Sequence, residues 1–174
     1  MGTKIISNPV YYGNLQTFYD ISGKRKQITS HNNGTSLLFE LFCRALLGQS
    51  TTGYTANYLR LVEKSSTGTS NITKYDIVLS GRALQEITND TNETTYEAIF
   101  TASFVKENMQ ARPTNDNPVC EAQILSTTHE VLAHTQLPDE VVNAIRDLKF
   151  GVSLVFEWHM GIKNETTKTE SENS

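Results

Sequence analysis

The chain has 174 residues, which is enough for one domain with a substantial apolar core. Hydrophobic residues make up 37% of the chain and occur in dense runs between polar stretches, which excludes a largely disordered protein. The formal net charge is −4, and Lys24-Arg25-Lys26 is the only basic cluster, so the charge pattern argues against a surface that binds nucleic acid.

Residues 1–30 are predicted to form an extended N-terminal arm. Val10-Tyr11-Tyr12 and Leu15–Tyr19 carry aromatic residues at the spacing of strands, and Gly13 interrupts them. At the other end, residues 163–174 (KNETTKTESENS) contain no apolar residue and are predicted to be a polar C-terminal tail. A single β-rich domain is expected between these two segments, over residues 31–162.

The most apolar element is a helix predicted at about residues 36–47. Thr35 and Ser36 can cap its start, and Gly48 suits the left-handed residue that often follows a helix. Apolar residues cover most of its circumference: Leu37, Leu38, Leu41, Phe42, Ala45 and Leu46. We therefore expect a main buried helix that plugs or backs a sheet; the alternative is that one side of it meets another subunit.

After Gly48 the pattern changes to short runs rich in β-forming residues, separated by polar loops. The predicted strands are 57–63, 74–80, 96–105, 119–125 and 129–134. A short second helix is predicted at about 139–147, because Pro138-Asp139-Glu140 is typical of a helix start. The clearest strand is 152–162, with these residues alternating onto one face: Val152, Leu154, Phe156, Trp158 and Met160.

This order of elements predicts the fold class. Short strands with intervening loops of about ten residues favour a mainly β domain, either an antiparallel sandwich or a jelly-roll-like domain. In such a domain the alternating face of 152–162 belongs to the core, packed against the Leu38 and Phe42 side of the helix. Glu157 and His159 would then lie on the opposite face.

No motif in the sequence indicates an enzymatic reaction. His129 and His134 lie five residues apart, which places them on opposite sides of a strand, and His159 with Glu157 has no third metal ligand marked by spacing. Cys120 does not lie in a recognisable nucleophile turn. We therefore expect no catalytic, cofactor-binding or metal-binding residue, and no enzyme activity.

Tyrosines near the Thr- and Asn-rich loops leave a binding role open. Tyr11, Tyr12, Tyr54 and Tyr58 could stack on sugar rings, as in a carbohydrate-binding β-sandwich module. The same aromatic residues could instead dock against the surface of a neighbouring subunit. Of these two uses, docking against a neighbouring subunit is the one we expect, and the carbohydrate-binding module is the alternative.

Three segments carry a resemblance to a known group of proteins. They are the helix Leu38–Gly48 (LFELFCRALLG), the strand Tyr58–Leu61 (YLRL) and the closing strand Phe156–Met160 (FEWHM). Their layout over about residues 30–162 resembles small virion proteins of tailed bacteriophages, in particular the auxiliary head and tail-ring proteins of crAss-like phages. The resemblance assigns no functional residue.

The resemblance implies a non-enzymatic structural subunit of a tailed phage virion, either a tail or neck ring protein or a head auxiliary protein. Such a subunit would assemble into a symmetric multimer, with copies of itself and other virion proteins as partners. No signal peptide and no apolar run long enough to cross a bilayer is found. We accordingly expect the chain to be made in the host cytoplasm, to end in the virion and to contact neither membrane nor nucleic acid directly.

Overall fold

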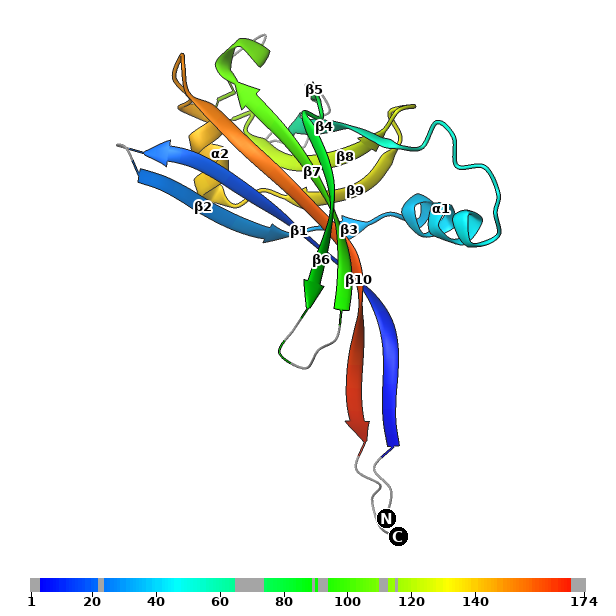
Figure 1. Cartoon of the computed structure of the whole chain (residues 1–174). Coiled ribbons are helices and arrows are strands. Elements are labelled where there is room, and N and C mark those ends of the chain that lie inside the picture. Colours follow the sequence, from blue (N-terminus) through cyan, green and yellow to red (C-terminus); the bar gives the residue numbers. More distant parts are fainter. Residues whose placement is uncertain are drawn as a thin grey trace.

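Figure 1 shows the fold of this computed structural model, which describes residues 4–21, 24–64, 74–88, 90, 94–109, 113–114 and 116–169. Two antiparallel five-stranded sheets pack face to face in that part of the chain. Sheet A has the strand order β2-β1-β10-β7-β6, and sheet B has the order β3-β9-β8-β4-β5. The prediction of a mainly β antiparallel sandwich is confirmed.

The strands of sheet A are β1 (Lys4–Ile21), β2 (Lys24–His31), β6 (Gly81–Thr88), β7 (Thr94–Val105) and β10 (Ser153–Thr169). Those of sheet B are β3 (Asn33–Gly34), β4 (Ala56–Glu63), β5 (Lys74–Val78), β8 (Val119–Ser126) and β9 (Val131–Gln136). The helices are α1 (Ser36–Leu46), α2 (Asp139–Arg146) and the short 3-10 helix η1 (Lys106–Asn108). Each strand predicted between residues 57 and 134 is present as β4, β5, β7, β8 or β9.

The core lies between the two sheets, and β10 supplies much of it. Leu154, Phe156 and Trp158 alternate onto the inner face of sheet A and are each 1% exposed. Leu61 of β4 and Ile124 of β8 are fully buried in the same apolar cluster. The alternation read from the sequence is therefore confirmed as a core face.

Helix α2 closes the side of the sandwich next to β8 (Figure 1). Its apolar stripe buries Val141 and Ile145 completely, which is why eight residues suffice to hold it. Its first turn also reaches sheet A, because Glu140 forms an ion pair with Lys26 of β2 and accepts a hydrogen bond of 3.1 Å from the hydroxyl of Tyr19.

A two-stranded stem, formed by residues 4–10 of β1 and 163–169 of β10, projects from the sandwich (Figure 1). The two segments pair along their whole length, from Lys4 opposite Thr169 to Val10 opposite Lys163. Neither segment is paired there to a further strand of the described residues, because β2 joins β1 only from Asn14 onward and the pairing of β7 with β10 ends at Ile162.

The stem corrects the predicted arm and tail. Residues 14–31 belong to sheet A rather than to an arm, and Leu15 is fully buried in the core. Residues 163–169 continue β10 instead of forming a free tail, while 170–174 lie outside the described residues. The sequence does not predict the 163–169 part of β10, because a strand held by backbone pairing with β1 needs no alternation of apolar and polar residues.

Strand β6 is likewise not among the strands predicted from the sequence. It pairs with β7 at eight consecutive positions, but it is an edge strand and most of its residues are exposed on both faces. A strand that buries neither face has no reason to alternate apolar and polar residues, so the period-two signal is lost.

Candidate functional site

Helix α1 begins and ends at well-defined caps. Thr35 accepts a hydrogen bond from the Leu38 N–H through its Oγ1, and its own N–H donates to the Leu132 carbonyl at 2.9 Å, which ties the helix start to β9. At the other end Gly48 has φ of +67°, the left-handed conformation expected from the sequence. Arg44 and Glu40 bond each other at 2.8 Å on the polar face.

The expectation that α1 is buried on most sides is wrong. The helix lies beside the sandwich, and none of its residues is buried. Leu37, Leu38 and Leu41 contact the core, whereas Phe39 and Phe42 remain about half exposed. An apolar periodicity shows that one face of a helix is to be shielded from water, but it does not show which residues shield it. In this chain the sandwich covers only part of the apolar face of α1.

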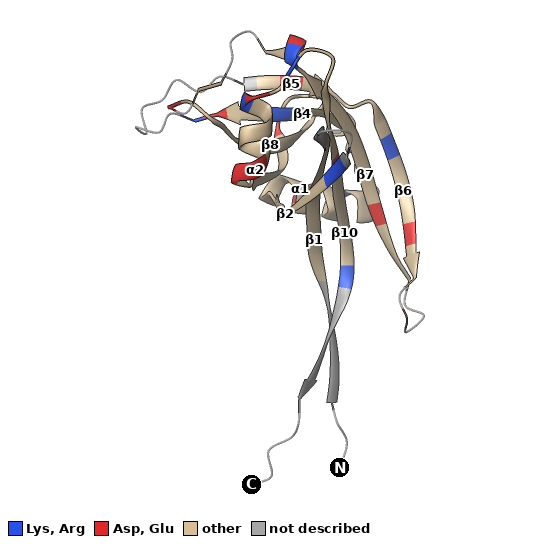
Figure 2. Ribbon diagram, turned by 90° about the vertical axis from the view of Figure 1, so that its left-hand side faces the viewer, with Lys and Arg blue, Asp and Glu red and all other residues tan. Residues whose placement is uncertain are grey.

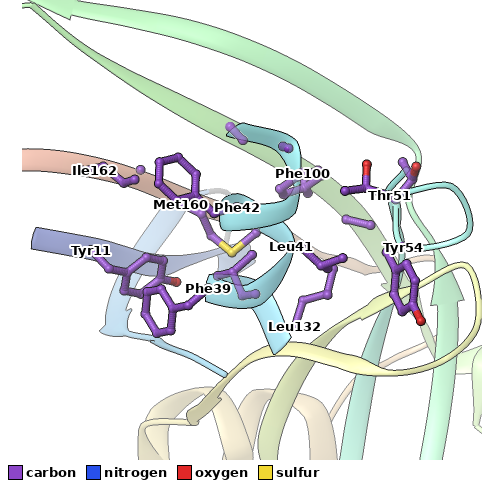
Figure 3. Close-up of a pocket in the computed structure, with 16 residues that line it drawn as sticks. Tyr11, Phe39, Leu41, Phe42, Thr51, Tyr54, Phe100, Leu132, Met160 and Ile162 are labelled. Carbon is purple, nitrogen blue, oxygen red and sulfur yellow. The ribbon is translucent and has the colours of Figure 1, made fainter. Parts of the chain in front are cut away.

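A cavity of about 390 Å³ separates α1 from the inner face of sheet A (Figure 3). The inner face loses its cover toward the stem: Trp158 is 1% exposed, Met160 is 9% exposed and Ile162 is 41% exposed. Most of the lining is apolar, and its large side chains are Leu38, Phe39, Leu41, Phe42, Phe100, Leu132, Met160 and Ile162.

The polar side chains of the cavity wall carry only hydroxyl groups, on Tyr11, Tyr54, Thr51 and Thr55. No acid, base or thiol among the described residues lines it. Such a wall suits an apolar side chain or aliphatic group more than a reacting substrate. Across the described part of the chain, no group of three or more His, Cys, Asp or Glu residues is placed to hold a metal ion.

Tyr11 forms the end of the cavity nearest the stem. Its ring packs edge-on against Phe39 with centroids 5.7 Å apart, and its hydroxyl donates to Oδ1 of Asn32. Asn32, itself buried, donates from Nδ2 to the carbonyl of His159 at 3.2 Å. Burial raises the pKa of Tyr11. This chain of bonds fixes the cavity wall to β10.

Gly13 makes room for that arrangement and gives a testable prediction. A Cβ on Gly13 would lie 2.7 Å from Cγ of Asn32 and 2.5 Å from the Tyr11 hydroxyl. Asn32 is held on both sides and cannot withdraw, so Gly13→Ala should lower the free energy of unfolding by about 1–3 kcal/mol through overpacking. Urea denaturation measures this loss.

Gly81→Ala is the matched control for Gly13→Ala. A Cβ there would meet the Thr101 side chain at 3.4 Å, an ordinary contact, and φ is not positive. Its free energy of unfolding should stay within about 0.5 kcal/mol of the unmodified chain. Equal stability of the two variants would mean that Asn32 is not locked in place.

Besides Tyr11 and Asn32, a second cluster of polar side chains lies on the outer face of sheet A. His159 Nδ1 is 3.0 Å from Oε2 of Glu97, and both side chains are only 9% exposed. Glu157 Oε2 is 3.8 Å from His159 Nε2, and no described residue forms a hydrogen bond with this nitrogen. Burial, then the hydrogen bond to Glu97 and its charge, raises the pKa of Tyr12 to about 12. The sequence placed Glu157 and His159 on this face but gave no sign that His159 is buried.

The tyrosines proposed for sugar binding do not form one platform. Tyr11 and Tyr54 line the cavity, but Tyr12 lies on the outer face of sheet A, with its ring against Gly161. Tyr58 stacks on His129, with ring centroids 4.3 Å apart and an interplanar angle of 26°.

The remaining sequence candidates are dispersed. Cys43 and Cys120 are both free thiols, Cys43 exposed on α1 and Cys120 half-buried on β8. Burial is the largest cause that raises the pKa of the Cys120 thiol. No helix in the described residues is long and apolar enough to cross a membrane.

Comparison with known proteins adds no assignment. A scan against protein-family models, a search of curated proteins and a search of solved structures each found no match. The functional argument therefore depends on the geometry of this chain and on the resemblance in the layout of its sequence.

Proposed function

We propose that the chain is a non-enzymatic structural subunit of a tailed phage virion, a tail or neck ring protein or a head auxiliary protein, that joins copies of itself and other virion proteins. The observation that carries the proposal is the stem of residues 4–10 and 163–169. An isolated two-stranded ribbon is at best marginally stable in water. No further strand of the described residues pairs with either outer edge of the stem, so a strand of a neighbouring subunit can add to it there.

The apolar surface around the cavity supports the same role. Phe39, Phe42 and Leu46 on α1 are exposed, and so are Leu84, Tyr96 and Ile162 on the inner face of sheet A. Large exposed apolar side chains gathered around one cavity are typical of a protein interaction site. Because hydroxyls are the only polar side-chain groups in the cavity wall, docking of a partner explains this surface better than catalysis does.

Removing the N-terminal strand of the stem tests the proposal. Deletion of residues 1–9 should prevent incorporation into virions of the phage that encodes the chain, while circular dichroism still reports a folded β protein. The cut stops before Val10 because Leu15, Thr17 and Tyr19 are buried in the sandwich, so a longer deletion would unfold it. Virion content is measured by mass spectrometry of purified particles.

Deletion of residues 170–174 is the control, because it leaves every described pair of the stem in place. This variant should be incorporated normally. Normal incorporation of the 1–9 deletion, or absence of the intact chain from virions, would contradict the proposed role. A glycan array tests the competing lectin role: specific binding that is lost on Tyr54→Ala would favour a carbohydrate module.

A further inference from the structure

Outside the stem, the two described sheets have four edge strands, and three of them carry features that discourage pairing with another chain. β3 has two residues and β5 has five, while β2 carries the basic run Lys24-Arg25-Lys26. Short strands and like charges are the usual protection of a sheet edge. β6 is the exception: it has eight residues, contains no proline or lysine, and pairs with β7 without a bulge.

No strand of the described residues covers the outer edge of β6. In Figure 2 the strand forms the margin of sheet A, and its main contacts are with β7. At its middle Leu84 is 75% exposed, a large apolar side chain that nothing in the described part of the chain covers. An open edge with an apolar centre is suited to receive another strand.

The order of charges along β6 selects one partner orientation. Arg82, Leu84 and Glu86 share the inner face, with Leu84 midway between the opposite charges. If two β6 strands pair antiparallel about a twofold axis at Leu84, each Arg82 lies opposite the partner's Glu86. A parallel pair in register would place like charges side by side, which is destabilising.

We propose that two copies of the chain join edge to edge through β6, antiparallel and centred on Leu84, so that sheet A continues across a twofold axis. This inference rests on the proposed multimeric role and names one contact within it. The contact is isologous, because the same surface serves both copies.

The side chains on the inner face fit this arrangement. Arg82 already donates from Nε to the Ala56 carbonyl at 3.0 Å and from Nη2 to Oδ1 of Asn57 at 2.6 Å. A guanidinium has five N–H groups, so three remain for a carboxylate of the second copy. On β7, Ala98 lies opposite Leu84 and opposite Met160 of β10, so the apolar row at the new seam runs to the cavity of each copy.

Disulfide trapping tests the twofold pairing. Leu84→Cys in a Cys43→Ser background should form an intermolecular disulfide under mild oxidation, because residues directly opposite on paired strands have Cβ atoms about 4.5–5.5 Å apart. Non-reducing electrophoresis should show at least about tenfold faster cross-linking than for Val78→Cys, a matched exposed position on β5. Cross-linking of both variants at equal rates would overturn the inference.

Charge reversal tests the register. Glu86→Arg should slow cross-linking of Leu84→Cys by about tenfold, because two symmetry-related attractions become repulsions. Adding Arg82→Glu should restore the rate, although it removes the bonds to Ala56 and Asn57 and so lowers the melting temperature. Failure of this double reversal to restore cross-linking, in a chain that circular dichroism shows folded, would exclude the twofold register.

The molar mass of the intact chain separates this inference from the proposed function. A multimer by light scattering, combined with no preferential cross-linking at Leu84, would overturn the β6 contact and leave the multimeric role standing. A monomer at every concentration, with normal incorporation into virions and no cross-link, would overturn the β6 contact alone. A dimer that Glu86→Arg dissociates would support it.

Discussion

Trp158→Ala is expected to lower the free energy of unfolding by about 3–5 kcal/mol, because it empties the centre of the core. Trp158 is 1% exposed and lies on β10 with Leu15 of β1 and Phe100 of β7 beside it in the same row. Its Nε1 has no hydrogen-bond partner among the residues that the structure describes, so the loss comes from packing alone. Urea denaturation at neutral pH measures the change.

Phe150→Ala is the matched control, another aromatic side chain cut to alanine. Phe150 is 70% exposed and lies in the turn before β10, with Nζ of Lys106 3.9 Å from its ring centroid. Its removal should cost no more than about 1 kcal/mol. Similar losses for the two variants would contradict the assignment of Trp158 to the core.

Fluorescence gives an independent measurement, because Trp158 is the only tryptophan in the chain. A buried indole in the folded subunit should emit at shorter wavelength than free tryptophan and resist quenching by iodide. Both properties should disappear on unfolding. Emission typical of free tryptophan from a folded chain would place the inner face of β10 at an interface rather than in the core.

The sequence predicted the elements whose apolar residues are covered within the chain. The alternation of Leu154, Phe156 and Trp158 predicted a core face because one side of β10 is buried and the other is not. The boundaries of α1 were predicted for a similar local reason, since Thr35 caps the helix and Gly48 adopts the left-handed conformation that ends it.

The parts that the sequence did not predict depend on contacts without a local signature. The stem is held by backbone pairs between segments more than 150 positions apart, such as Lys4 and Thr169. Both faces of β6 are mostly exposed, so it has no apolar alternation. The apolar face of α1 borders a cavity and not only the packed core. The hydrogen bond from Tyr11 to Asn32 beside Gly13 could not be predicted either, because it depends on the register between β1 and β2. Apolar pattern specifies which residues avoid water, but topology decides what covers them.

Stability should fall steeply as the pH rises above about 10, because buried tyrosines keep their protons in the folded chain. Burial, then the hydrogen bond to Glu63 and its charge, raises the pKa of Tyr75, which is 5% exposed. Burial also raises the pKa of Tyr11, and that of Tyr12 is raised to about 12. In the unfolded chain each ionises near pH 10.

The sign follows from proton counts. Above about pH 10 the unfolded chain has released tyrosine protons that the folded chain still holds, so the folded state binds more protons and loses stability with rising pH. This contribution is present in full below about pH 10 and is lost as the pH rises toward the folded pKa values. Tyr75 should contribute a slope of at most about 1.4 kcal/mol per pH unit, with smaller contributions from the half-buried Tyr11 and Tyr12.

Tyr75→Phe separates this slope from the other groups that titrate at high pH. The variant should lose about 1–3 kcal/mol at neutral pH, because the buried carboxylate of Glu63 no longer receives the hydroxyl hydrogen bond. Above about pH 10 its free energy of unfolding should decline less steeply than that of the unmodified chain, by up to about 1.4 kcal/mol per pH unit. The two stability curves should therefore converge as the pH rises. Urea denaturation from about pH 7 to pH 11 tests this, and parallel curves would show that Tyr75 ionises equally in the folded and unfolded chains.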